Sequence, residues 1–97
     1  MVIITFKKIR EYAAAYSSAK IALLHWYNVV EKADWTCFAD IKKQFASVDY
    51  VGEDRYVFNI KGNHYRLVAM IHFDIRTVYI RFIGTHAEYD KIAVDET

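Results

Sequence analysis

The sequence contains no proline, only three glycines and a single cysteine in 97 residues. Because Cys37 has no second thiol and no Cys/His ligand spacing around it, neither an internal disulfide nor a zinc site is expected. No apolar stretch is long enough to span a membrane, and the first residues do not resemble a signal peptide. The length of 97 residues predicts one domain over residues 1–97, and the 55% of hydrophobic residues allows a dense core. Because a signal peptide and a membrane span are both lacking, the protein is expected in the cytoplasm, and no cofactor is expected.

The sequence also lacks a large excess of charge of one sign, since its formal net charge is only +1. The distribution is more informative, because residues 55–86 contain five Lys or Arg against one acidic residue, together with three of the four histidines. Such a segment fits an anionic ligand. It also fits a solvated strand face, and charge alone does not choose between these two interpretations.

The first half of the chain has helical periodicity. A short β-branched strand over residues 2–4 is followed by Thr5, a residue suited to cap a first helix. The apolar stripe of that helix, at three- and four-residue spacing, consists of Phe6, Ile9, Ala13 and Tyr16. Ser17 and Ser18 interrupt the pattern and can cap a second helix, so a helical hairpin is predicted.

The second helix carries apolar residues around most of its circumference, from Ile21 to Ala33, so we expect it to pack on more than one side. A third, short helix is expected to begin at Asp34 or Thr36. Its apolar positions are Phe38, Ile41 and Phe45.

From about Val48 the apolar residues alternate with a period of two, which indicates β-strands. Turns are predicted at Gly62-Asn63 and at Asp74-Ile75. Together these elements predict an α+β fold, in which an N-terminal helical hairpin and a short helix pack on an antiparallel sheet.

The two turns fix the pairing of the strands. The first places Asn59 opposite Arg66 and Phe58 opposite Leu67, and the second places Leu67 opposite Phe82. One face then carries the core residues Phe58, Leu67, Ala69, Ile71, Val78, Ile80 and Phe82. A slip of one residue would scatter them, which supports this register.

The opposite face is expected to be polar and basic. Its members are Asn59, Lys61, His64, Arg66, Val68, Met70, Tyr79, Arg81 and Ile83. Lys61 is expected to face His64, and Arg81 to face Val68, on the diagonal from Arg66. No carboxylate is interleaved with these cations, which favours a polyanionic ligand, although a carboxylate from the helices could still pair with them.

A last helix is predicted by a capping-box pattern, in which Thr85 is followed three residues later by Glu88. This helix is expected to run from His86 to about Ala93. His86 and Tyr89 would share one face of it, beside the basic cluster.

These residue types suit RNA cleavage without a metal, in which the RNA's own 2′-hydroxyl attacks the adjacent phosphate. Arg matches phosphate oxygens with a planar fork, His titrates near neutrality, and Tyr can orient a group, stack on a base or take part in proton transfer. Simpler interpretations stay open, because His25 and His72 fit packing roles and His64 fits an exposed position equally well.

Three stretches together resemble the HigB-type toxins of the RelE/ParE superfamily: YVFNIKGNHYRLVAM at 56–70, YIR at 79–81 and THAEYD at 85–90. The resemblance covers most of the chain and implies a RelE-like, microbial RNase-like fold. It implies the toxin of a type II toxin–antitoxin system, a ribosome-dependent mRNA endonuclease that cuts translated message in the 30S A site. It also implies a helix-turn-helix antitoxin, similar to HigA, as the partner.

The resemblance assigns roles to particular residues. Four are implied to lie in the active site: Arg66, Arg81, His86 and Tyr89. Four more, from the resemblance and the polar cluster, are expected to bind RNA around it: Asn59, Lys61, Asn63 and His64. Two alternatives stay open, a ParE-like toxin that inhibits DNA gyrase without cleaving RNA, and a binding module with no catalytic activity.

Overall fold

The computed structural model describes residues 1–93, which form an α+β fold of the kind predicted. The strands are Val2–Ile4 (β1), Asp49–Tyr50 (β2), Arg55–Ile60 (β3), Tyr65–His72 (β4) and Thr77–Thr85 (β5). The α-helices are Phe6–Ala15 (α1), Lys20–Lys32 (α2), Phe38–Gln44 (α3) and His86–Tyr89 (α4), with 3-10 turns η1 at Ser17–Ala19 and η2 at Phe73–Ile75. No helix in this part of the chain is long and apolar enough to cross a membrane.

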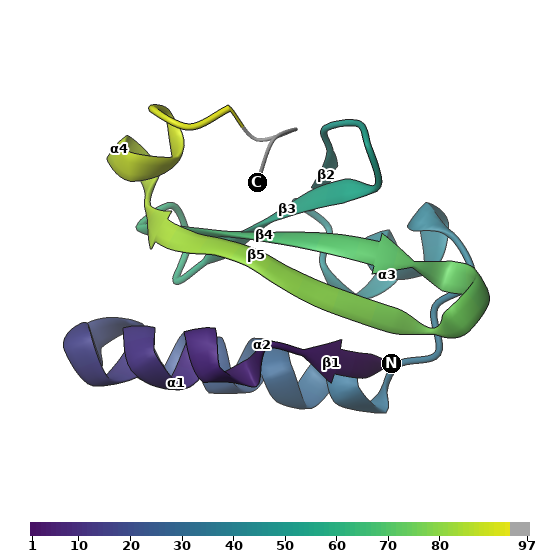
Figure 1. Cartoon of the computed structure of the whole chain (residues 1–97), viewed down its shortest axis with the longest axis horizontal. Coiled ribbons are helices and arrows are strands. Elements are labelled where there is room, and N and C mark those ends of the chain that lie inside the picture. Colours follow the sequence, from purple (N-terminus) through teal and green to yellow (C-terminus); the bar gives the residue numbers. More distant parts are fainter. Residues whose placement is uncertain (94–97) are drawn as a thin grey trace.

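The strands form one sheet in the order β1-β5-β4-β3-β2. Helices α1 and α2 lie against one face of it, whereas α4 stands at the opposite face, at the end where β5 finishes (Figure 1). Strands β2 to β5 are antiparallel, as predicted, but β1 pairs with β5 in parallel. The two-residue strand β2 was not predicted, because it is too short to show a period of two.

The centre of the core is the ring of Phe58 on β3, which is 1% exposed. Trp26 of α2 meets it edge-on, with ring centroids 5.4 Å apart, and Phe45 at the end of α3 does so at 5.2 Å. Trp35, from the segment between these helices, stacks on it at 6.3 Å. One strand position therefore joins both helices and their connection to the sheet.

Helix α2 packs against β3 and against α1, which confirms that it is covered on more than one side. Leu23, Trp26 and Val30 are buried, and Tyr27 contacts the Phe6 ring of α1 at 4.5 Å between centroids. One apolar residue of this helix is left out of the packing, since Ile21 is 84% exposed.

Thr5 is the N-cap residue of α1, as predicted, but neither its hydroxyl nor that of Ser18 caps a helix, because both bond to distant strands instead. Thr5 precedes α1 but makes no side-chain cap bond, and its Oγ1 donates to the Ile80 carbonyl at 3.1 Å and accepts from the Ile80 N–H at 3.2 Å. Ser18 lies within η1, and its Oγ is 2.5 Å from the Tyr65 hydroxyl on β4. Each hydroxyl thus links the helical layer to the sheet.

Helix α3 begins at Phe38, later than predicted. The reason lies in the segment before it, where the Asp40 carboxylate accepts hydrogen bonds from both the amide and the hydroxyl of Thr36, each at 2.9 Å. This contact holds Thr36 outside the helix. Phe45 follows the helix as its C-cap rather than forming part of it.

The capping box of α4 is confirmed. The Glu88 amide donates to Thr85 Oγ1 at 3.1 Å, and the Thr85 amide donates to Glu88 Oε1 at 2.8 Å. The helix ends at Tyr89 rather than near Ala93, because the Ile92 amide bonds to the Tyr89 carbonyl in a tighter three-residue turn.

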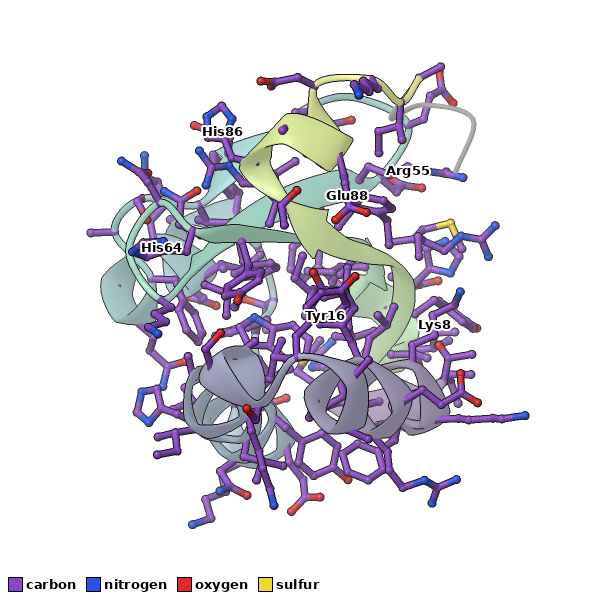
Figure 2. The ribbon with its side chains drawn as sticks, turned by 90° about the vertical axis from the view of Figure 1, so that its left-hand side faces the viewer. Lys8, Tyr16, Arg55, His64, His86 and Glu88 are labelled. Atoms are coloured by element: carbon purple, nitrogen blue, oxygen red, sulfur yellow. The ribbon has the colours of Figure 1, made fainter. Side chains whose placement is uncertain are left out.

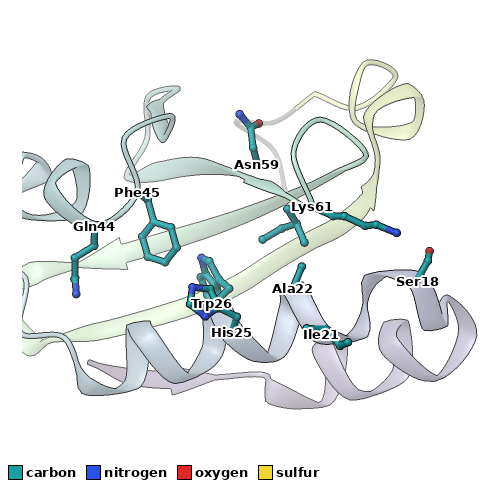
Figure 3. A pocket seen from close by; sticks show the side chains of 10 residues that line it. Ser18, Ile21, Ala22, His25, Trp26, Gln44, Phe45, Asn59 and Lys61 are labelled. Atoms are coloured by element: carbon teal, nitrogen blue, oxygen red, sulfur yellow. The ribbon is translucent and has the colours of Figure 1, made fainter.

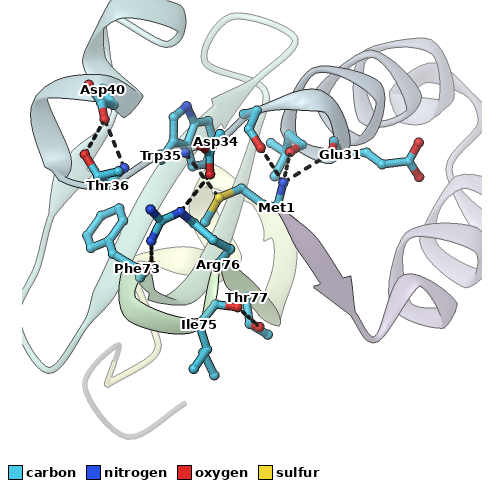
Figure 4. Close-up of polar contacts among 12 residues, drawn as sticks. Met1, Glu31, Asp34, Trp35, Thr36, Asp40, Phe73, Ile75, Arg76 and Thr77 are labelled. Atoms are coloured by element: carbon cyan, nitrogen blue, oxygen red, sulfur yellow. Dashed lines mark hydrogen bonds and ion pairs between the residues drawn. The ribbon is translucent and has the colours of Figure 1, made fainter.

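Two contacts fix the end of the molecule opposite α4 (Figure 4). The amino group of Met1 donates to the carbonyls of Glu31, at 3.2 Å, and Ala33, where α2 has no further residues to satisfy its last carbonyls. Arg76, in the turn between β4 and β5, donates to Asp34 at 2.7 Å. Both contacts hold the helical layer to the sheet.

The predicted pairing is confirmed for the whole first hairpin, where Asn59 pairs with Arg66. It is also confirmed for the half of the second hairpin nearest its turn, where Ala69 pairs with Ile80.

Beyond that point a β-bulge shifts the register by one residue. Val68 pairs with Phe82 and Leu67 pairs with Ile83, so Arg81 is the extra residue and the predicted Leu67–Phe82 pair is wrong. Since alternate residues point to opposite faces, the bulge exchanges the two faces of β5 beyond it. Ile83, rather than Phe82, packs against the core.

The first prediction concerns the core. Phe58→Ala is expected to lower the free energy of unfolding by about 3–5 kcal/mol, because it removes a buried ring from contact with three aromatic neighbours. Chemical denaturation would measure the loss. Ile75→Ala, at a position 55% exposed, is the control and should change stability by no more than about 0.5 kcal/mol. Equal effects at the two positions would contradict the central role of Phe58.

The second prediction concerns α4. Thr85→Ala is expected to lower stability by about 0.5–2 kcal/mol, because it removes the side-chain acceptor of the capping box. Thr85→Ser keeps that acceptor and should retain most of the stability. Thermal or chemical denaturation of both variants would show whether the hydroxyl group matters; equal losses in the two would mean that it does not.

Candidate functional site

Arg66 is the second residue of β4, the central strand of the sheet, and lies near the end of the sheet that α4 contacts. Its neighbours across the sheet are Asn59 on β3, as predicted, and Gly84 on β5, where Ile83 had been predicted. A side chain at Gly84 would begin 2.5 Å from the ring of Phe82, so the glycine lets that ring fold over the strand beside the arginine. This arrangement follows from the bulge and could not be read from alternation alone.

The guanidinium of Arg66 is not neutralised by an ion pair. It lies 3.4 Å from the carbonyls of Asn63 and Tyr65, which are long, weak contacts. Among residues 1–93, no salt bridge joins Arg66 or Lys61 to a carboxylate. A partly exposed arginine with no carboxylate partner keeps its hydrogen-bond fork free for an anion.

The turn between β3 and β4 presents three of the predicted RNA-binding residues to solvent. Lys61, Asn63 and His64 are exposed. The His64 amide bonds to the Lys61 carbonyl at 3.2 Å, which closes the turn. Lys61 and Gly62 both have positive φ angles, of 52° and 64°, and glycine meets this requirement without strain.

Helix α4 is joined to this turn through the backbone. The amide of His86 donates to the carbonyl of His64 at 3.2 Å, so the two histidines, 22 positions apart in sequence, belong to one end of the molecule. Figure 2 shows their side chains on the same side of that end. The capping box and this bond together fix where the first turn of α4 places His86.

Asp90 is a candidate site residue that was not predicted as one. Its Oδ2 lies 3.0 Å from Nδ1 of His86, four residues earlier. The spacing of four on a helix was a usable signal, and Asp90 closes the THAEYD stretch. A carboxylate bonded to Nδ1 fixes the ring orientation and leaves Nε2 as the nitrogen available for proton transfer.

Tyr89 lies between charges of both signs. Burial raises the pKa of its phenol above the usual value; the positive charge of Arg66 opposes this shift, and Asp49 and Asp90 reinforce it. Helix α4 contacts the end of β4 that carries Arg66, which agrees with an electrostatic influence of Arg66 on Tyr89. With its pKa raised, the phenol stays protonated at neutral pH and can donate a hydrogen bond.

Arg81 does not take the predicted place. As the extra residue of the bulge it does not face Val68. It lines a hollow of about 310 Å³ between α1 and β5, together with Lys8 and Tyr12 of α1. This position differs from the one diagonal to Arg66 that the predicted register gave it.

The described part of the chain contains no group of three His, Cys, Asp or Glu side chains placed to hold a metal ion. What the site does offer is a free guanidinium at Arg66, an imidazole oriented by a carboxylate at His86, and a protonated phenol at Tyr89. These groups can bind a phosphate and move protons next to it.

Comparison with known proteins places this chain in a family. Residues 19–92 match the HigB_toxin model, described as the RelE-like toxic component of a toxin–antitoxin system. The mRNA interferase toxin HigB of Escherichia coli K12 is 37% identical over 93 residues, which cover 93% of this chain and 88% of that protein. An mRNA interferase HigB of Escherichia coli O6:H1 is 30% identical over 94 residues, covering 95% and 91%. This agreement confirms the resemblance seen in the sequence: the chain belongs to the HigB family of RelE-like toxins.

Proposed function

We propose that this chain is the toxin of a type II toxin–antitoxin system and an endoribonuclease that cuts mRNA during translation. The observation that carries the proposal is the position of α4, with His86 and Tyr89, against the end of β4 that holds Arg66, while Arg66 forms no ion pair with a carboxylate among the described residues. The naming of its relatives as mRNA interferases supports the same activity. Residues 1–97 would act as a single RelE-like domain.

The reaction would be an internal transfer that needs no metal. The 2′-oxygen of the RNA bonds to the adjacent phosphorus, and the bond from phosphorus to the 5′-oxygen breaks, leaving a 2′,3′-cyclic phosphate and a free 5′-hydroxyl. One group must take the proton of the 2′-hydroxyl and another must protonate the departing oxygen. A cation must stabilise the charge on the phosphate while both happen.

The residues suit these roles to different degrees. Arg66 would bind the phosphate, since no carboxylate within residues 1–93 forms an ion pair with its fork. His86 would transfer a proton through Nε2, and Asp90 would orient it through Nδ1. Tyr89 would be a donor rather than a base, because its pKa is raised.

The surrounding predicted residues would hold the RNA strand. Asn59 lies beside Arg66, and the exposed turn offers Lys61, Asn63 and His64. Arg81 is proposed as an active-site residue on the family resemblance alone, because the bulge removes the geometric reason for placing it next to Arg66. A contact with RNA further along the strand is the role that fits its position.

The proposed partners follow from the family. A cognate helix-turn-helix antitoxin, similar to HigA, would bind the toxin, and the substrate would be message in the 30S A site. The site of action would then be the cytoplasm. Inhibition of DNA gyrase is not proposed, because the relatives are named mRNA interferases and the proton-transfer groups have no use in it.

The third prediction tests the site. Arg66→Ala and His86→Ala are each expected to slow mRNA cleavage in a reconstituted translation reaction by about 10²–10⁴-fold and to abolish growth arrest on expression. Arg10→Ala and His72→Ala are matched controls, since Arg10 is exposed on α1 and His72 pairs with Asp54 at the other end of β4. Full toxicity of both site variants, with the controls also toxic, would rule out the assignment.

The fourth prediction concerns pH. Tyr89→Phe is expected to reduce cleavage by about 10²-fold, and by the same factor at every pH between about 6 and 9. The raised pKa means that the phenol holds its proton throughout this range, so it contributes no change of slope. Cleavage rates of the parent and the variant, measured across that range, would check it. A limb of the pH profile that disappears in the variant would show that Tyr89 titrates and that the assignment is wrong.

A further inference from the structure

A second hollow, larger than the one that Arg81 lines, lies between α2, the end of α3 and β3 (Figure 3). Its volume is about 680 Å³. Trp26, Phe45 and Ile60 supply apolar walls, and Lys61 and His25 contribute polar groups. Neither the proposed reaction nor the core accounts for an apolar hollow of this size.

Two groups at the hollow are left without the contacts that they normally make. Ile21 lines the hollow and is 84% exposed. An exposed apolar side chain next to an apolar hollow is a feature of protein-binding surfaces. The indole N–H of Trp26 is buried, in a residue 1% exposed, and has no hydrogen-bond partner in the part of the chain that the structure describes. A buried donor without an acceptor is uncommon and calls for an explanation.

The hollow also borders an open stretch of sheet edge. Strand β2 covers β3 only at Tyr56 and Val57, so the outer edge of β3 from Asn59 onward has no neighbouring strand among the described residues. Asn59, Ile60 and Lys61 all line the hollow. A protein segment could therefore bury a side chain in the hollow and reach main-chain groups along the strand.

The chemistry of the lining favours one kind of occupant. It contains no Asp or Glu, and its charged or chargeable members are Lys61 and His25. Nucleic acid would need a cationic rather than an apolar surface. An apolar side chain flanked by acidic residues fits both the walls and the charges, and this is the chemistry of a protein segment.

We infer that this hollow receives an apolar, acid-flanked segment of the cognate antitoxin. The inference rests on the proposed function, which supplies the partner. A segment seated there would cover Asn59 and Lys61, two of the residues proposed to hold RNA. The antitoxin would then neutralise the toxin by occupying one side of the RNA path, with His86 and Asp90 left in place.

The fifth prediction uses Ile21→Glu, which puts a negative charge at the rim without disturbing a buried residue. The probe is the helix-turn-helix protein encoded beside the toxin gene, first shown to rescue cells from the unmodified toxin. Ile21→Glu is expected to bind it at least about tenfold more weakly, to remain toxic alone, and to escape rescue. Ile75→Glu, at another exposed isoleucine outside the hollow, is the matched control and should be rescued normally.

A second variant guards against an effect peculiar to one position. His25→Glu, also exposed and in the lining, should weaken antitoxin binding in the same way. Normal binding and normal rescue of both variants would overturn the inference. So would a loss of toxicity in Ile21→Glu with an unchanged circular dichroism spectrum and melting temperature, because the hollow would then serve the ribosome or RNA.

The outcome also separates this inference from the proposed function. If the unmodified chain binds the antitoxin but cuts no message in a reconstituted translation reaction, the proposed activity fails. Weaker antitoxin binding by Ile21→Glu in that case would still support the docking surface.

Discussion

The burial of Phe58 among the rings of Trp26, Trp35 and Phe45 is the interaction on which the rest of the structure depends. It attaches α2 and α3 to one face of the sheet through a single strand position, so the helical layer occupies that face and leaves the other to α4. A chain of 97 residues has little apolar area to spare, and aromatic rings bury a large area per residue. The polar face is free to hold a site because the opposite face carries most of the core.

On the polar face, short-range backbone contacts determine the geometry of the proposed site. The capping box orients the first turn of α4, and one amide bond joins His86 to the turn that carries His64. Asp90 lies one helical turn after His86 and bonds to its ring, while Tyr89 comes within the electrostatic influence of Arg66. A four-residue helix can hold the proposed catalytic residues in place because hydrogen bonds fix both its cap and its link to the neighbouring turn.

The same few residues of β3 and its turn connect the two surfaces. Asn59 and Lys61 belong to the proposed RNA site and also line the apolar hollow beside α2. A toxin has to be switched off by a protein and yet act on a nucleic acid, and these ligands differ in chemistry. An apolar hollow that borders a polar face would give each ligand its own contacts, and under the proposed docking the two would compete where these surfaces meet.

The sequence by itself determined the local features: the period-two strands, the first hairpin with Asn59 opposite Arg66, and the capping box that begins α4 at His86. These depend on contacts between residues close together in the chain, so composition and spacing predict them. Only the tertiary structure decided that a bulge displaces Arg81, that the Thr5 hydroxyl bonds to β5 rather than to the first turn of α1, and that Ile21 stays exposed beside a hollow. Each of these results depends on packing between segments far apart in sequence. One inserted residue in a strand, or one hydrogen-bond acceptor on a distant strand, is enough to change the result. The local sequence pattern therefore does not predict it.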